Sequence, residues 1–99
     1  MAINIQISAK FKKQGWKVKI RDKERSEDPH VTIIKGVKAW RLNLRTKEFM
    51  DTSPPEKEVP EKLKKEIAEA KKLKRIIEEW DKMYPWNKVD SQNKEEENG

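Results

Sequence analysis

The sequence contains no cysteine, one histidine and three glycines, one of which is the last residue. The absence of cysteine excludes disulfides, cysteine-ligated zinc, iron–sulfur clusters and a thiol nucleophile. One histidine excludes a multi-histidine metal site, and so few glycines leave no glycine-rich phosphate loop. We therefore expect no metal and no other cofactor.

Long apolar runs and a signal-peptide pattern are also missing. No apolar stretch approaches the ~20 residues that cross a bilayer. The first residues have neither the basic region nor the continuous apolar region of a secretory signal. The sequence thus predicts a cytoplasmic protein with no membrane partner, and 99 residues form at most one domain with a modest core.

Charge, in contrast, is abundant and unevenly distributed. Lys and Arg number 24 and Asp and Glu 18, so the net charge is +6. Residues 1–50 hold 13 basic and 5 acidic side chains, residues 51–86 hold 9 of each, and residues 87–99 hold 2 basic and 4 acidic. We expect a single domain over residues 1–86, followed by a disordered acidic tail over residues 87–99.

In the first half, apolar and polar residues alternate with the period of two that is typical of strands with one buried face. The pattern predicts four strands, at about 3–12, 16–22, 30–35 and 39–45. Their short connections favour an antiparallel meander, because parallel neighbours need crossovers of a dozen or more residues. Trp16 and Trp40 fall on the apolar face, so we expect them in the core.

In the second half, apolar residues recur every three or four positions between Pro60 and Pro85, which predicts one helix over about 60–83. The expected fold is α+β, a four-stranded antiparallel meander with one face covered by this long C-terminal helix. We expect Tyr84 and Trp86 to fold back over the open end of the core.

The alternation sends many cations to the other, uncovered sheet face, which is predicted to be a basic plate. Such a plate can neutralise phosphates of a nucleic acid. The plainer interpretation is a solvated face kept charged for solubility. The candidate nucleic-acid-binding residues are Lys10, Lys12, Lys17, Lys19, Arg21, Arg41 and Arg45.

His30 is the only side chain expected to titrate near neutral pH, so it is the one weak candidate for a catalytic role. A metal-free ribonuclease would use His30 as general acid or base, with Arg41 and Arg45 stabilising phosphate charge. The alternative is a histidine that only satisfies the junction between a loop and a strand. An enzyme is the less favoured class.

The helix offers a third function, a protein-interaction module. Leu73 and Met83 flank its main apolar stripe and Trp86 follows Pro85, which gives slightly more apolar surface than one small sheet covers. That surplus could hold a homodimer or a partner protein.

A motif pattern adds a resemblance. Asp28-Pro29-His30-Val31, a hairpin through Gly36, the run from Ala39 to Glu48, a proline-bearing break and a helix ending near Trp80 follow in order. This order resembles a family of small bacterial domains of unknown function with a Pro-Pro-His motif at the third strand.

The resemblance spans about Asp28 to Trp80 and has three departures. Asp28 replaces the first proline, Thr32 replaces a second histidine, and Lys47 replaces a turn glycine. The resemblance implies a small sheet-plus-helix domain, often encoded beside a second small protein in an arrangement like a toxin–antitoxin pair. It implies no activity, so the sequence indicates a non-enzymatic binding domain.

Overall fold

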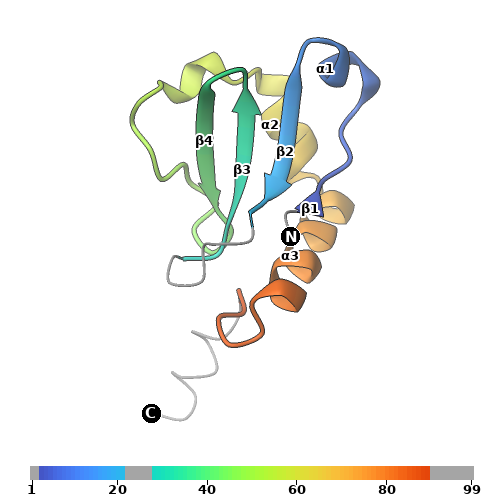
Figure 1. The fold of residues 1–99 in the computed structure, drawn as a ribbon, viewed down its shortest axis with the longest axis vertical. Coiled ribbons are helices and arrows are strands. Elements are labelled where there is room, and N and C mark those ends of the chain that lie inside the picture. The colour runs from blue at the N-terminus through green and yellow to red at the C-terminus, as the bar shows by residue number, and fades with distance from the viewer. Residues whose placement is uncertain (1–2, 22–27, 90–99) are drawn as a thin grey trace.

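The fold is a four-stranded antiparallel sheet with strand order β1-β2-β3-β4, as the alternation predicted (Figure 1). The computed structural model describes residues 3–21 and 28–89. Each strand pairs with its sequence neighbour, which makes the sheet a meander. The strands are β1 Ile3–Asn4, β2 Trp16–Ile20, β3 His30–Lys35 and β4 Lys38–Asn43.

Helices cover one face and one end of this sheet. In Figure 1, α2 lies behind the strands and α3 descends beside β1. No helix among the described residues is long and apolar enough to cross a membrane. The helical elements are α1 Ala9–Lys13, the short 3-10 helix η1 Glu56–Glu58, α2 Glu61–Ala68 and α3 Ala70–Met83.

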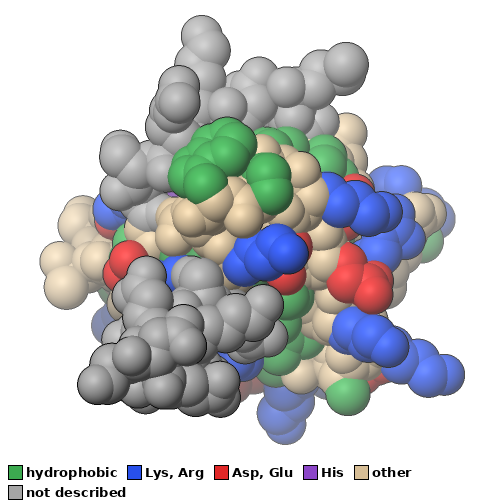
Figure 2. Space-filling view, turned by 90° about the horizontal axis from the view of Figure 1, so that it is seen from below, with side chains coloured by type: hydrophobic (Ala, Val, Ile, Leu, Met, Phe, Trp, Pro, Cys, Tyr) green, Lys and Arg blue, Asp and Glu red, His purple; other side chains and the backbone are tan. Residues whose placement is uncertain are grey.

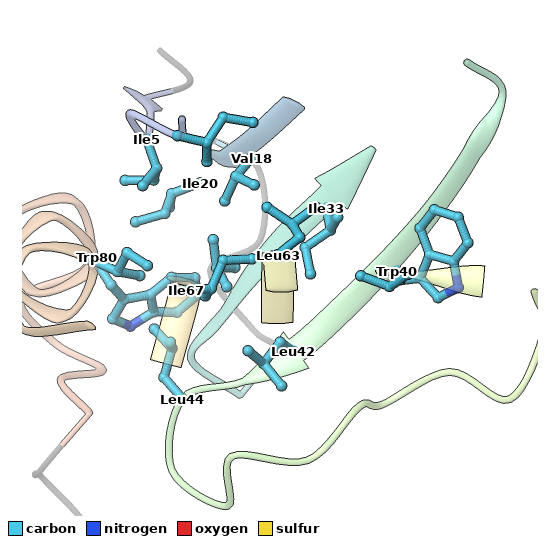
Figure 3. Packing of buried hydrophobic residues seen from close by; sticks show 14 of the residues in the cluster. Ile5, Val18, Ile20, Ile33, Trp40, Leu42, Leu44, Leu63, Ile67 and Trp80 are labelled. Atoms are coloured by element: carbon cyan, nitrogen blue, oxygen red, sulfur yellow. The ribbon is translucent and has the colours of Figure 1, made fainter. Parts of the chain in front are cut away.

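The core lies between the apolar sheet face and the two longer helices. Val18, Ile33 and Trp40 are register partners across three strands, and all three are buried. Leu63 and Ile67 of α2 pack on this face, and Trp80 of α3 closes the core at the end opposite to Trp40 (Figure 3). Trp16 and Trp40 are in the core as predicted.

The first predicted strand, at about 3–12, is wrong in its second half. Ala9–Lys13 forms the helix α1, which buries Phe11 and exposes Ala9. Ala and Lys are good helix formers, and Gly15 beyond the helix end has φ 95°, a left-handed conformation that glycine adopts without strain. Ile5 and Ile7 are buried, so within residues 3–12 the predicted alternation of buried and exposed residues holds only before α1.

The predicted single helix over 60–83 is also interrupted. Glu69 has extended backbone angles, φ −60° and ψ 137°, so α2 ends at Ala68 and α3 begins at Ala70. Ala and Glu are strong helix formers, and neither proline nor glycine lies at this point. Tertiary packing therefore overrides local preference, and the break lets the two helices follow different directions.

The last predicted strand, at about 39–45, ends two residues early. After Asn43 the chain turns, and Lys47 has φ 65°. The chain then returns along β4, with hydrogen bonds from Asn43 N to Glu48 O at 2.9 Å and from Met50 N to Arg41 O at 2.8 Å. This return segment covers the outer edge of β4.

The C-terminal region departs from the expected tail over 87–99. Val89 is buried, so residues 87–89 belong to the packed structure, while 90–99 lie outside the described residues. Tyr84 is buried as expected. Trp86 does not fold over the core, since 61% of its surface is exposed.

Candidate nucleic-acid interface

Two of the predicted cations lie on a helix and not on a strand. Lys10 and Lys12 belong to α1, where both are exposed. Lys13, which the alternation did not single out, is exposed on the same helix. The helix directly precedes β2, so these lysines lie at the end of the strand where Trp16 begins.

Lys17 and Lys19 lie on β2 and point away from the core. Lys19 is the register partner of Asn4 on one side and Thr32 on the other, on the face opposite to Val18. Contrary to the prediction from the alternation, that outer face is not uncovered throughout, because its β3 position, Thr32, is a neutral residue that is only 1% exposed. The cations are therefore concentrated along β2 and α1 and do not cover the whole sheet.

Arg41 on β4 is held by a carboxylate. Its Nε donates to Asp51 Oδ2 at 3.1 Å and its Nη2 donates to Asp51 Oδ1 at 2.8 Å. The hydrogen bond from this guanidinium lowers the pKa of Asp51 from its ordinary value of 3.8, against an opposing contribution from burial. Arg41 thus fastens the return segment to β4, and we leave it out of the interface.

Arg45 is occupied in a similar way by the C-terminal region. Its Nε donates to Val89 O at 2.9 Å, and its Nη2 donates to Lys88 O at 2.8 Å and to Asn87 Oδ1 at 3.2 Å. Its Nη1 also lies 3.8 Å from Asp28 Oδ1. These contacts anchor residues 87–89 against the turn after β4, so Arg45 has a structural role.

The six remaining cations form what we call the α1–β2 surface. None of them forms an ion pair with a described residue. Residues 1–21 contain these six cations and no acid, which matches the whole chain's net charge of +6. This run without acidic residues is the sequence signal from which Lys13 could have been predicted as part of the surface. The α1–β2 surface consists of Lys10, Lys12, Lys13, Lys17, Lys19 and Arg21.

A groove of about 360 Å³ lies within this surface. One wall is the extended segment 4–7 and the other is β2. Lys12, Lys17 and Lys19 line it. Because like charges around a concave, low-dielectric surface focus the electric field, the groove is suited to attract an anion.

The wall formed by segment 4–7 is held from both sides. Ile5 N donates to Val18 O at 2.8 Å, and Lys72 Nζ donates to Gln6 O at 2.6 Å. Glu66 Oε2 accepts from Ser8 N and from Lys72 Nζ, both at 2.8 Å. Burial opposes ionisation of Glu66, yet these two donors hold its pKa below the ordinary value of 4.5. The groove is therefore preformed.

More cations lie on the far side of the same wall. A second depression of about 220 Å³ is lined by Ile5 and Gln6 together with Lys71, Lys72 and Arg75 of α3. Seen from the end of the molecule (Figure 2), Lys and Arg side chains gather on the side of α3, with Asp and Glu side chains among them. The helix side thus carries mixed charge, unlike the α1–β2 surface.

His30 is 1% exposed. Its Nδ1 lies 2.7 Å from Asp28 O, and its ring centroid is 5.5 Å from that of Trp80. A general acid or base must reach the proton that it transfers, and this ring offers almost no surface to a substrate. The geometry favours the structural interpretation of His30, at the junction of a loop and β3.

A cavity of about 800 Å³ lies between the return segment and the helices. Apolar residues such as Leu42, Phe49 and Ile67 supply its walls, and its charged lining residues are two lysines and two glutamates, Lys47, Lys64, Glu48 and Glu56. Because the charges cancel, this cavity is less suited to a polyanion than the groove. The described residues also contain no cluster of His, Asp and Glu that could hold a metal ion.

Comparison with known proteins supplies no relative. No family model matches the chain, and neither a curated protein nor a solved structure is significantly similar to it. The resemblance to the Pro-Pro-His family therefore stays a prediction from the motif order.

Proposed function

We propose that this protein binds nucleic acid, and that the α1–β2 surface contacts the phosphate backbone. The observation that carries the proposal is the group of six exposed or half-exposed cations that have no acidic partner among the described residues. Phosphate contacts release condensed counterions, and this release supplies most of the free energy of non-specific binding.

The groove at β2 supports contact along a line. Lys17, Lys19 and Arg21 occupy alternate positions, and alternate residues of a strand are about 6.6 Å apart. Together with Lys12 at the groove they offer four cations along β2. A backbone bound at four phosphates loses affinity on the order of a hundredfold between 50 and 200 mM salt.

The test is a binding titration with fluorescently labelled oligonucleotides at 50 and 200 mM salt. The variant Lys17→Glu with Lys19→Glu reverses two charges in the groove and is expected to abolish binding at both salt concentrations. The matched control is Lys62→Glu with Lys74→Glu, which makes the same charge change at exposed helix positions outside the groove. Equal loss in both variants, or no binding by the wild type at 50 mM salt, would refute the proposal.

The helix-mediated alternative, a homodimer or a protein partner, has less support. Leu63, Ile67, Ile76 and Trp80 are fully buried in the chain's own core. Leu73 and Met83 are half-buried against that core. The helices therefore have little apolar surface left for another chain, and a partner encoded nearby stays a prediction of the family resemblance alone.

The ribonuclease alternative has less support still. It needs His30 at a surface and needs Arg41 and Arg45 available for phosphate. His30 is buried, and both arginines are engaged by protein oxygens. We therefore propose binding without catalysis.

A further inference from the structure

Trp86 is the largest exposed hydrophobic side chain in the described part of the chain. It lies in the turn after α3, and 61% of its surface is exposed. Small domains generally bury every large side chain that they have, because such side chains contribute most of the core's apolar area. An aromatic ring left in solvent beside a charged surface therefore points to a ligand.

The ring is held in place by a rigid support. Tyr84 packs edge-on against Trp86 with ring centroids 5.9 Å apart, and Tyr84 packs against the buried Trp80 at 4.2 Å. The turn beneath it is fixed by hydrogen bonds from Asn87 N to Tyr84 O at 2.9 Å and from Trp80 Nε1 to Asn87 O at 2.8 Å. Trp86 is presented by the core and does not hang from an unsupported segment.

The support also places Trp86 near the α1–β2 surface. Tyr84 Oη donates a hydrogen bond to Arg21 O, and Arg21 directly follows β2. Two contacts, ring to ring and hydroxyl to carbonyl, thus join Trp86 to the main chain of Arg21, the last residue of the surface. Along β2 the cations run from Lys17 through Lys19 to Arg21, and Tyr84 links the main chain of Arg21 to the exposed indole.

A row of cations that ends at an aromatic ring is the arrangement that binds single strands. The cations follow the backbone while a base stacks on the ring, and stacking is tolerant of sequence because every base has a π face. A duplex keeps its bases stacked on each other and offers the ring nothing to pair with. We propose that the ligand is a single-stranded nucleic acid and that Trp86 stacks on one of its bases; this inference rests on the proposed function.

The experiment compares a single-stranded oligonucleotide with a duplex hairpin of the same length, at 50 mM salt, for three variants. Trp86→Ala is expected to weaken single-strand binding by about fivefold to a hundredfold and to change duplex binding less than twofold. Trp86→Phe keeps a stacking ring and should restore most of the single-strand affinity. Val37→Ala, at an exposed hydrophobic residue of the β3–β4 turn, should change neither.

The outcomes separate this inference from the proposed function. If Trp86→Ala leaves single-strand binding unchanged while Lys17→Glu with Lys19→Glu removes it, the stacking role is wrong and the basic surface stands. If Trp86→Ala weakens both ligands equally, the single-strand preference is wrong. If the wild type binds neither oligonucleotide, the proposed function fails, and the role of Trp86 fails with it.

Discussion

The lysines of α1 and β2 are chemically like those of α2 and α3, but of these four elements only α2 and α3 contain lysines with a carboxylate partner among the described residues. On the helical side Lys64 lies 2.8 Å from Glu61 and 3.3 Å from Glu56, and Lys72 lies 2.8 Å from Glu66. On the α1–β2 surface no cation has such a partner among the described residues. Paired charges hold segments together, whereas a cluster of one sign repels itself and gains its attraction only from a polyanion.

The difference separates cations that maintain the fold from cations available for a ligand. Arg41 and Arg45 belong to the cations that maintain the fold, although the alternation predicted them on the binding face. Substitutions in the shared core, at single cations and in the turns should therefore have different effects on stability and on binding.

The largest expected effect is loss of the buried ring that links the two regions. Trp80→Ala removes an indole that is 0% exposed and contacts His30 and Tyr84. The free energy of unfolding should fall by about 3–5 kcal/mol, as for other buried aromatic truncations. Urea denaturation followed by circular dichroism measures it. Trp86→Ala is the matched control, expected within about 0.5 kcal/mol of wild type, and similar losses in the two would contradict the assignment of buried and exposed rings.

Arg41 and Lys19 provide the next test, because the comparison predicts opposite consequences for two cations that share a row of the sheet. Arg41→Ala should lower the free energy of unfolding by about 1–2 kcal/mol, since it removes charged hydrogen bonds that are only partly shielded from solvent. Lys19→Ala should leave stability within about 0.5 kcal/mol and weaken oligonucleotide binding. Denaturation and titration of both variants measure the two effects, and the reverse assignment would overturn the comparison.

The Asp51 carboxylate adds a pH dependence of known sign. Its pKa is lowered in the folded state by the hydrogen bonds from Arg41, so the unfolded chain takes up the proton first. The stabilisation is therefore complete above about pH 5 and is lost as the pH falls through the folded-state pKa, below the ordinary 3.8. Asp51→Asn should be less stable than wild type at pH 7, and the difference should shrink toward pH 3. A stability difference between the two proteins that stays constant from pH 7 to pH 3 would show that the ion pair of Asp51 with Arg41 is not its origin.

The predictable parts of the fold are those in which a local sequence pattern determines the secondary structure. Val18 lies between two lysines, the segment 30–35 is rich in β-branched residues, and Gly36 at φ 61° marks the β3–β4 turn, so the three longer strands follow from the sequence. The break at Glu69 did not follow, because Ala68 and Ala70 favour helix and neither proline nor glycine marks the interruption.

The sequence predicted that the candidate site is basic, but it did not predict which cations belong to the site. Alternation gives the face of a residue and says nothing about partners, so it could not distinguish Lys19 from Arg41. The partner Asp51 comes ten residues later, and the carbonyls that hold Arg45 come from Asn87 to Val89. Trp86 was misplaced for the same reason: its exposure depends on how the turn after α3 is fixed by Trp80 and Tyr84.

The smallest expected effect concerns the turns, where the two regions differ in one residue type. Gly15, which precedes β2, and Gly36, which follows β3, both have positive φ. The turn after β4 instead has Lys47 at φ 65°. A side chain in this left-handed conformation costs about 1 kcal/mol. Lys47→Gly should therefore raise the free energy of unfolding by about 0.5–1 kcal/mol, less what is lost with the exposed hydrogen bond from Lys47 Nζ to Leu44 O.

The reverse exchange at Gly36 is the control for this prediction. A Cβ added at Gly36 would have no atom within 4 Å, so Gly36→Lys changes the backbone preference without a clash. It should lower stability by about 1 kcal/mol, the opposite sign to Lys47→Gly. Urea denaturation of the two variants measures both. If both substitutions destabilise, then the contact of the Lys47 side chain with Leu44 outweighs the backbone strain, and the β4 turn depends on its side chain where the β3–β4 turn depends on its glycine.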